Sequence, residues 1–399
     1  MRKSQFSTPF IVSPSAAAVS LRRLEMGAHR DGNHYDENWL QQHLHANPAS
    51  IPVSDIDSAF HDLVGVCTEL DTPAGPIDNV FVTPTGKLVL VEVKLWRNPE
   101  ARGKVIGQIL DYAKELVRWD YEELQKQVSR KLNQTGNPLF DLVHQRYPDV
   151  DEAEFVDGIS RCLSKGQFML LIVGDGIREG ASSIANFLND LGNLHFTLGM
   201  IEMALYEMPN SSILIQPRVL AETLIVERTV IDVVGRDISF LSDQSDLTED
   251  VTDENFYLPF WRELAEKLRL DDAAQTLPNP RRDQNMYFSL PPSSTEAWLN
   301  AYFAGSSRQI GVYFRVANSE FGKLAAGGLA AQKEEILGEL PEGVYWDPSK
   351  GYLKIGLRKH IDDVWSESNR DEIQQFFLVN SNLFVNVFRS RMERIASDL

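Results

Sequence analysis

Residues 76–94 read PIDNVFVTPTGKLVLVEVK and indicate two β-strands joined by a short turn. The tetrapeptide TPTG at 83–86 suits a type I turn, with Pro at its second position and Gly at its fourth. Gly86 can take the left-handed conformation that completes a three-residue hairpin loop with a bulge. We therefore predict a hairpin in which Thr83 pairs with Lys87.

Counting back from this turn sets the register of the two strands. Val80 then faces Leu90, and Asp78 faces Glu92. Because side chains alternate along a strand, all four lie on one face, and Lys94 continues that face. Directly opposed residues have Cβ atoms about 4.5–5.5 Å apart, and like charges in those positions destabilise a sheet. The hairpin therefore brings together two carboxylates that repel each other.

The strand that carries Glu92 is apolar on both faces, which predicts that it is central and buried. Two buried carboxylates at this distance require a proton, a cation or both. A divalent ion such as Mg²⁺, bound by one or two carboxylates and water, fits the pair. Lys94 could position a water molecule or stabilise charge on a phosphate. The alternative is a structural salt bridge of Asp78, Glu92 and Lys94 at the end of the sheet.

The flanking sequence alternates helices and strands. A helix is predicted at Tyr35–Ala46, and a second runs from Asn98-Pro99 to about Val117 with Val105, Ile109, Tyr112 and Leu116 on its packing face. Strands are predicted near 64–70, 76–83, 87–95, Phe168–Val173, 196–208 and 212–230. This order predicts an α/β fold with a mixed sheet flanked by helices.

The segment resembles the PD-(D/E)XK nuclease superfamily, whose pattern is an Asp entering one core strand and Glu/Asp-x-Lys in the next. Here Pro76-Ile77-Asp78 and Glu92-Val93-Lys94 match these elements, although Ile77 separates the proline from the aspartate. Gln108 and Tyr112 resemble the Gln-x-x-x-Tyr motif of the RecB-like branch. The similarity covers about residues 35–175.

The resemblance implies an αβββαβ restriction-endonuclease-like core and a Mg²⁺- or Mn²⁺-dependent phosphodiesterase acting on DNA, in restriction, repair or defence. It implies that Asp78, Glu92 and Val93 bind the metal and that Lys94 lies near the attacking water. Gln108 would orient the substrate or the site, with Tyr112 on the same helix face. Glu37 occupies the position where many members have an acid in the first helix.

We divide the chain into a nuclease-like domain (1–236), an acidic linker (237–256) and an α+β accessory domain (257–399). In the last part we predict helices at Phe260–Leu270, Leu324–Glu339 and Ile373–Ile395, and strands at Ile310–Val316 and Tyr352–Leu357. This part resembles a domain of unknown function that often follows such nucleases in bacterial proteins. It would recognise a target, a partner or a second copy of the chain in a homodimer.

The composition sets limits on these expectations. The chain has 399 residues, which suggests two or three domains, and its net charge of −18 argues against a broad basic surface. Two cysteines, with no signal peptide and no membrane span, indicate a reducing, cytoplasmic location. Because the net charge is strongly negative, an alternative hypothesis remains: a non-catalytic nucleic-acid-binding, regulatory or scaffold protein that retains a nuclease fold.

Overall fold

A computed structural model describes residues 8–12, 18–27, 35–95, 101–175, 196–209, 212–222, 256–280, 282–294, 296–348 and 352–397. The chain divides into two compact units, Met1–Val226 and Glu227–Leu399, each with its own core. The predicted linker at 237–256 and the predicted Asn98-Pro99 helix start lie outside the described residues, apart from residue 256. Among the described helices, none has the length and apolar character that a membrane crossing requires.

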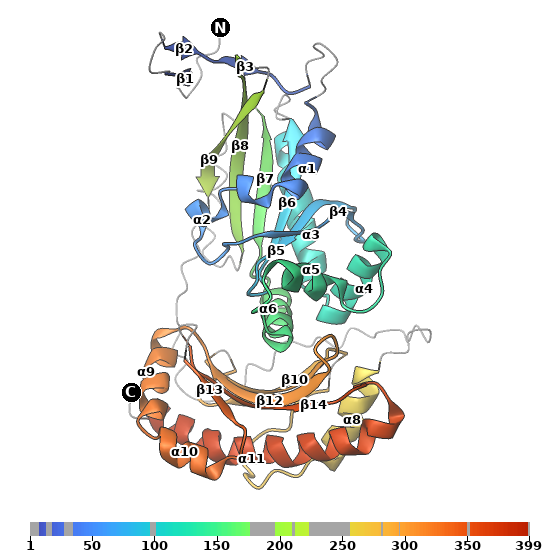
Figure 1. Cartoon of the computed structure of the whole chain (residues 1–399), viewed down its shortest axis with the longest axis vertical. Coiled ribbons are helices and arrows are strands. Elements are labelled where there is room, and N and C mark those ends of the chain that lie inside the picture. The colour runs from blue at the N-terminus through green and yellow to red at the C-terminus, as the bar shows by residue number, and fades with distance from the viewer. Residues whose placement is uncertain are drawn as a thin grey trace. The chain divides into compact units, whose positions relative to one another are not determined.

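The described residues of the first unit form a seven-stranded mixed sheet (Figure 1). Its strands are β3 (Arg22–Leu24), β4 (Val64–Leu70), β5 (Ile77–Val82), β6 (Leu88–Leu95), β7 (Met169–Asp175), β8 (Thr197–Glu207) and β9 (Ile213–Glu222). Their order is β3-β8-β7-β6-β5-β4, with β9 also paired to β8. The pairs β4–β5 and β5–β6 are antiparallel, whereas β6–β7 and β7–β8 are parallel. Strand β6 is therefore central, as its apolar sequence predicted. A separate two-stranded sheet pairs β1 (Phe10–Ile11) with β2 (Val19–Ser20).

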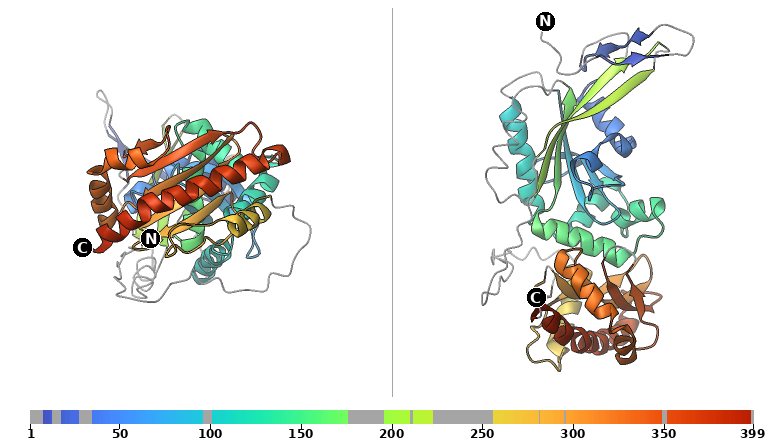
Figure 2. Two further views of the ribbon diagram at one scale, coloured as in Figure 1. Left: turned by 90° about the horizontal axis from the view of Figure 1, so that it is seen from below. Right: turned by 90° about the vertical axis from the view of Figure 1, so that its left-hand side faces the viewer.

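Helices cover both faces of this sheet. Helix α3 (Ala101–Leu116) lies on one face and α1 (Glu37–Ala46) on the other, as the right-hand view of Figure 2 shows. Buried Ile109 and Tyr112 of α3 pack on the face that carries Leu88 and Leu90 of β6. The other helices among the described residues of this unit are α4 (Tyr121–Leu132), α5 (Pro138–Arg146) and α6 (Glu152–Lys165) on the α3 face. Helix α2 (Val53–Ile56), preceded by a 3-10 turn at Pro48–Ser50, lies on the α1 face. By alternation, Glu92 and Lys94 point to the α3 face.

The predicted hairpin is confirmed at its turn and along its strands. Thr83 N donates to Lys87 O at 2.9 Å, and Gly86 has a left-handed φ of 76°. Val80 is paired with Leu90. The tip of the hairpin rests on α6, since a Cβ added to Gly86 would lie 2.6 Å from main-chain atoms of that helix.

The described part of the second unit contains a five-stranded antiparallel sheet in the order β10-β11-β12-β14-β13 (Figure 1). The strands are β10 (Asn285–Leu290), β11 (Ala297–Ala304), β12 (Gln309–Val316), β13 (Tyr345–Asp347) and β14 (Lys354–His360). The helices are α8 (Tyr257–Lys267), α9 (Glu320–Ala330), α10 (Lys333–Glu339) and α11 (Arg370–Ser397), with a 3-10 turn at Glu367–Asn369. The long helix α11 packs along one face of the sheet, where Phe388 stacks on Phe314 with ring centroids 4.1 Å apart.

One expectation for this unit was wrong, and three strands were not predicted. The predicted helix Leu324–Glu339 is two helices, because the chain leaves helical geometry at Gln332, which follows the weak helix formers Gly327 and Gly328. The sheet has three further strands, β10, β11 and β13. Strand β11 is buried at every position and so lacks the alternation that reveals a half-exposed strand.

Candidate active site on the β5–β6 hairpin

The sheet opens locally at Asp78. Regular pairing of β5 with β6 ends at Asn79 and Val91, one residue before the predicted Asp78–Glu92 pair. Instead, the carboxylate of Asp78 accepts a hydrogen bond from the main-chain N–H of Val93 at 2.7 Å. A side chain thus replaces a main-chain partner at this point, and the Asp78 carboxylate is held beside β6.

Glu92 is fully buried, with none of its surface exposed. The ammonium of Lys94 lies 3.1 Å from Oε1, and the hydroxyl of Tyr112 also interacts with the carboxylate, although neither oxygen accepts a hydrogen bond of good geometry among the described residues. An ionised carboxylate in this position is costly unless cations or donors compensate it. Lys94 and Tyr112 are therefore its polar partners, and both contacts are imperfectly aligned.

The pKa values of the three residues reflect this environment. Burial, together with the charge of Asp78, raises the pKa of Glu92 to about 7, against the opposing effect of Lys94. Burial also raises the pKa of Asp78, opposed by the hydrogen bond from Val93 and by Lys94. For Lys94, burial works to lower the pKa, but the charges of Glu92 and Glu37 outweigh it and the pKa is raised. Lys94 is therefore protonated at neutral pH.

The structure brings the other predicted residues to the same place. Glu37, in the first turn of α1, accepts a hydrogen bond from Leu95 N at 2.8 Å and lies 3.6 Å from the Lys94 ammonium. Gln108 donates to the hydroxyl of Tyr112 at 2.5 Å, and that hydroxyl donates to the carbonyl of Pro76 at 2.7 Å. Gln108 and Tyr112 thus hold the chain two residues before Asp78.

Three residues at the site were not predicted from the sequence. Gln41 of α1 donates to the carbonyl of Asp78 and to the carboxylate of Glu69, and Asn79 donates to the carbonyl of Gln41. Gln41 follows Glu37 by four residues, and residues at this spacing share a helix face, so its position was available from the sequence. The place of Glu69 depends on the pairing of β4 with β5, and the contact of Asn79 depends on the packing of α1, neither of which a local pattern reveals.

The donor set fits a divalent ion held by two carboxylates. Among the described residues, no group of three or more His, Cys, Asp or Glu side chains is placed to hold a metal. Mg²⁺ is commonly bound by one or two carboxylates, with water and substrate oxygens completing its coordination. The poorly compensated Glu92 carboxylate is the observation that favours a cation here.

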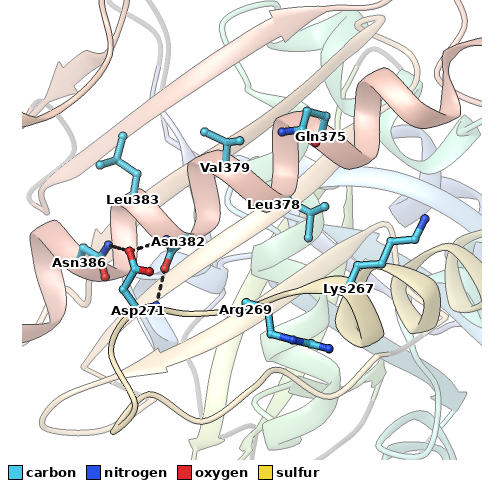
Figure 3. Close-up of a pocket in the computed structure, with 9 residues that line it drawn as sticks. All are labelled: Lys267, Arg269, Asp271, Gln375, Leu378, Val379, Asn382, Leu383 and Asn386. Atoms are coloured by element: carbon cyan, nitrogen blue, oxygen red, sulfur yellow. Dashed lines mark hydrogen bonds between the residues drawn. The ribbon is translucent and has the colours of Figure 1, made fainter.

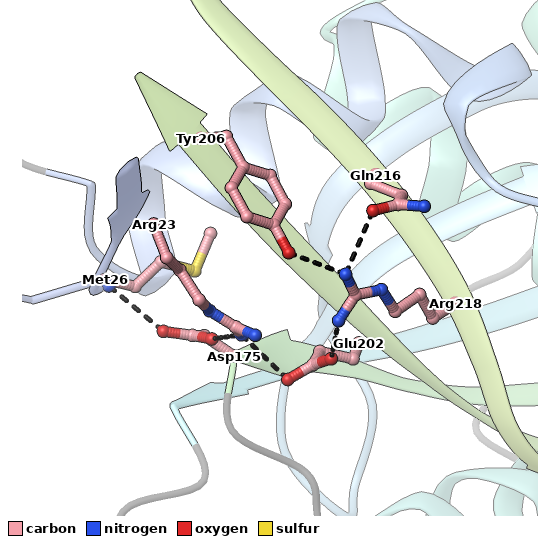
Figure 4. Close-up of polar contacts among 7 residues, drawn as sticks. All are labelled: Arg23, Met26, Asp175, Glu202, Tyr206, Gln216 and Arg218. Carbon is pink, nitrogen blue, oxygen red and sulfur yellow. Dashed lines mark hydrogen bonds and ion pairs between the residues drawn. The ribbon is translucent and has the colours of Figure 1, made fainter. Parts of the chain in front are cut away.

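A second polar cluster lies farther along the same sheet (Figure 4). Arg23 of β3 contacts Asp175 at 2.6 Å and Glu202 at 2.8 Å, and Arg218 of β9 contacts Glu202 at 3.1 Å. Glu202 is paired with Gly174, which is paired with Lys94, so Glu202 lies two strands from Lys94 on the same face. Two arginines and two carboxylates balance each other in this cluster, and we assign it no chemistry.

The second unit has a groove of about 460 Å³ between α11 and the chain after α8 (Figure 3). Among the described residues that line the groove, the one carboxylate is that of Asp271, which accepts hydrogen bonds from the amides of Asn382 and Asn386, both at 2.8 Å. The groove thus lacks the paired acids found on the hairpin.

Comparison of the chain with protein-family models, with curated proteins and with solved structures found no significant match.

Proposed function

We propose that this protein is a divalent-metal-dependent nuclease that hydrolyses phosphodiester bonds of DNA at the β5–β6 hairpin. The observation that carries the proposal is the fully buried carboxylate of Glu92 beside Asp78, with Lys94 as its ion-pair partner. The succession α1, β4, β5, β6, α3, β7, with α2 inserted before β4 and α4, α5 and α6 inserted before β7, supports the αβββαβ restriction-endonuclease-like core that the sequence suggested.

Each residue has a role that follows from its surroundings. Asp78 and Glu92, with the main-chain carbonyl of Val93, would hold Mg²⁺ or Mn²⁺. When bound, such an ion supplies Lewis-acid chemistry, which activates water and neutralises charge on the scissile phosphate. Lys94 is protonated at neutral pH, so it acts as a cation and hydrogen-bond donor rather than as a base. Its side chain is 30% exposed and can meet a substrate phosphate.

The surrounding residues keep these groups in place. Glu37 holds the Lys94 ammonium from the side of α1 and anchors β6 through Leu95 N. Tyr112, supported by Gln108, fixes the carbonyl of Pro76 at the entrance to β5. In this account Gln108 acts through Tyr112 to orient the site, which is one of the two roles that the sequence resemblance implied.

The test is a cleavage assay with the full chain and plasmid, single-stranded DNA or RNA, in Mg²⁺, Mn²⁺ or EDTA. We expect metal-dependent cleavage of DNA that falls at least about 100-fold in Glu92→Gln and in Lys94→Ala. Glu263→Gln is the matched control, because Glu263 forms a Glu–Lys ion pair with Lys267 at 2.7 Å in the second unit. It should cleave like the wild type.

Two outcomes would refute the proposal. One is the absence of metal-dependent cleavage of any of these substrates by folded wild-type protein. The other is cleavage that persists in folded Glu92→Gln. Binding of nucleic acid without cleavage would instead favour the non-catalytic rival.

A further inference from the structure

Gln41 lies at the point where the sheet opens and connects α1 to both strands beside it. Its side-chain amide donates to the carbonyl of Asp78 at 2.8 Å and to the carboxylate of Glu69 at 2.5 Å. Its own carbonyl accepts a hydrogen bond from the side chain of Asn79 at 3.0 Å. Gln41 and Asn79 are both buried. This reciprocal pair fixes the main chain on both sides of the Asp78 carbonyl.

The hydrogen bond from Gln41 to Glu69 also affects the electrostatics of Asp78. Thr68 pairs with Asn79 and Leu70 pairs with Ile77, so Glu69 stands opposite Asp78 on the neighbouring strand. Two carboxylates directly opposed across a sheet repel each other. Glu69 has a left-handed φ of 53°, which interrupts the regular pairing, and its carboxylate is bound by the Gln41 amide. A non-glycine residue in that conformation is strained, so surrounding contacts must hold it there.

We propose that Gln41 is a positioning residue for the hairpin site: it fixes the backbone of Asp78 and keeps the Glu69 carboxylate bound to an amide. The metal binding and cleavage in this inference rest on the proposed function, whereas the positioning of Asp78 by Gln41 does not. Without the amide of Gln41, the Asp78 carbonyl loses a donor and Glu69 is released to repel Asp78. The Asp78 carboxylate then shifts away from Val93 N and from any ion that it shares with Glu92.

The experiment compares Gln41→Met with Gln42→Met in the full chain. Gln42 is the next residue of the same helix and is exposed, so it controls for helix propensity and side-chain volume. Three quantities are measured: the Mn²⁺ affinity by calorimetry, kcat and KM for plasmid cleavage in Mn²⁺, and hydrogen exchange of the Val93 amide. The Val93 amide reports directly on the Asp78 carboxylate, because it donates to that group.

For Gln41→Met we expect Mn²⁺ affinity and kcat to fall about tenfold, with KM unchanged. Val93 should exchange at least about tenfold faster, while Val89 on the same strand keeps its wild-type rate. Gln42→Met should match the wild type in every measurement. If Gln41→Met does not fold, Gln41→Leu removes the donor without adding a charge and is expected to behave in the same way.

Wild-type Mn²⁺ affinity together with a wild-type Val93 exchange rate in Gln41→Met would overturn the inference. The Val93 measurement also separates this outcome from failure of the proposed function. If the wild type neither binds Mn²⁺ nor cleaves DNA, the nuclease proposal fails, and the exchange rate of Val93 still decides whether Gln41 positions Asp78.

Discussion

Glu92 is a fully buried carboxylate whose neighbours include a second carboxylate. Burial and the charge of Asp78 raise its pKa to about 7, even though Lys94 opposes both effects from 3.1 Å away. Such a group adds little to stability, since a protein interior favours the neutral form of an acid. A cation supplied from solution would both relieve this cost and give the site its chemistry.

The raised pKa of Glu92 makes stability depend on pH in a defined direction. The carboxyl has a pKa of about 4.5 when exposed and about 7 in the fold, so the folded state binds its proton more tightly. Stability from this group is therefore complete below pH 4.5 and is lost as the pH rises through 7. In EDTA, we expect the free energy of unfolding of Glu92→Gln, relative to that of the wild type, to increase by about 2–3 kcal/mol as the pH rises from 5 to 8. Urea denaturation at each pH measures this difference. A difference that does not change with pH would contradict this assignment.

The same pKa couples metal binding to proton release. Below pH 7 the carboxyl of Glu92 is mostly protonated, and it must lose its proton to bind an ion. We expect Mn²⁺ binding at pH 6 to release close to one proton, and binding at pH 8.5 to release almost none. Calorimetry in buffers with different ionisation enthalpies measures this number. Equal proton release at both pH values would show that Glu92 is not a ligand.

At the level of elements, the hairpin was predictable because a local turn determines its register. Thr83 and Gly86 lie within four residues of each other, so counting from the turn located Glu92 and Lys94 correctly. The opening at Asp78 was not predictable in this way. It depends on Gln41 from a helix and on Glu69 from a strand that is separated from Asp78 by a loop.

In the second unit the prediction was less complete for a physical reason. The helix α11 was predicted because its apolar side chains recur over many turns. Strand β10 alternates polar or aromatic residues with apolar ones, so its pattern was available from the sequence. Strand β11 is buried at every position, and its burial depends on contacts with distant segments that a local pattern does not indicate.

The turn of the hairpin gives a prediction at this scale. Gly86 combines a φ of 76° with an approach that would bring a Cβ within 2.6 Å of Ile159 N and Phe155 O in α6. We expect Gly86→Ala to reduce the free energy of unfolding by about 3 kcal/mol or more, because backbone strain and overlap add together. Urea denaturation measures the loss.

Gly136 provides the matched control. Its φ is 86°, and a Cβ there would meet nothing within 4 Å. Gly136→Ala should therefore cost only about 1 kcal/mol, from backbone strain alone. Equal losses in the two variants would mean that the hairpin tip does not press on α6 as described.

For the whole molecule, the net charge of −18 opposes the binding of DNA that the proposed function requires. Contacts between basic side chains and phosphates supply most non-specific DNA affinity, and an acidic chain repels DNA at long range. Cations bound at the hairpin would offset part of this repulsion where the substrate approaches Asp78 and Glu92. DNA binding should therefore depend on divalent ions as well as on ionic strength.

We expect Ca²⁺, compared with EDTA at matched ionic strength, to strengthen binding of a DNA duplex by about tenfold or more, equivalent to about 1.4 kcal/mol. Fluorescence anisotropy with the full chain measures this effect, and Glu92→Gln should lose it. Equal affinity in Ca²⁺ and EDTA would point to cation-independent binding, as in the non-catalytic rival.

The most direct measurement is a crystal structure of the full chain soaked in Mn²⁺, with anomalous scattering recorded to locate the ion. We predict an anomalous peak bound by carboxylate oxygens of both Asp78 and Glu92, with the Lys94 ammonium nearby. A folded protein that shows no peak at the hairpin, or one whose Asp78 and Glu92 carboxylates point to opposite faces of the sheet, would contradict the account.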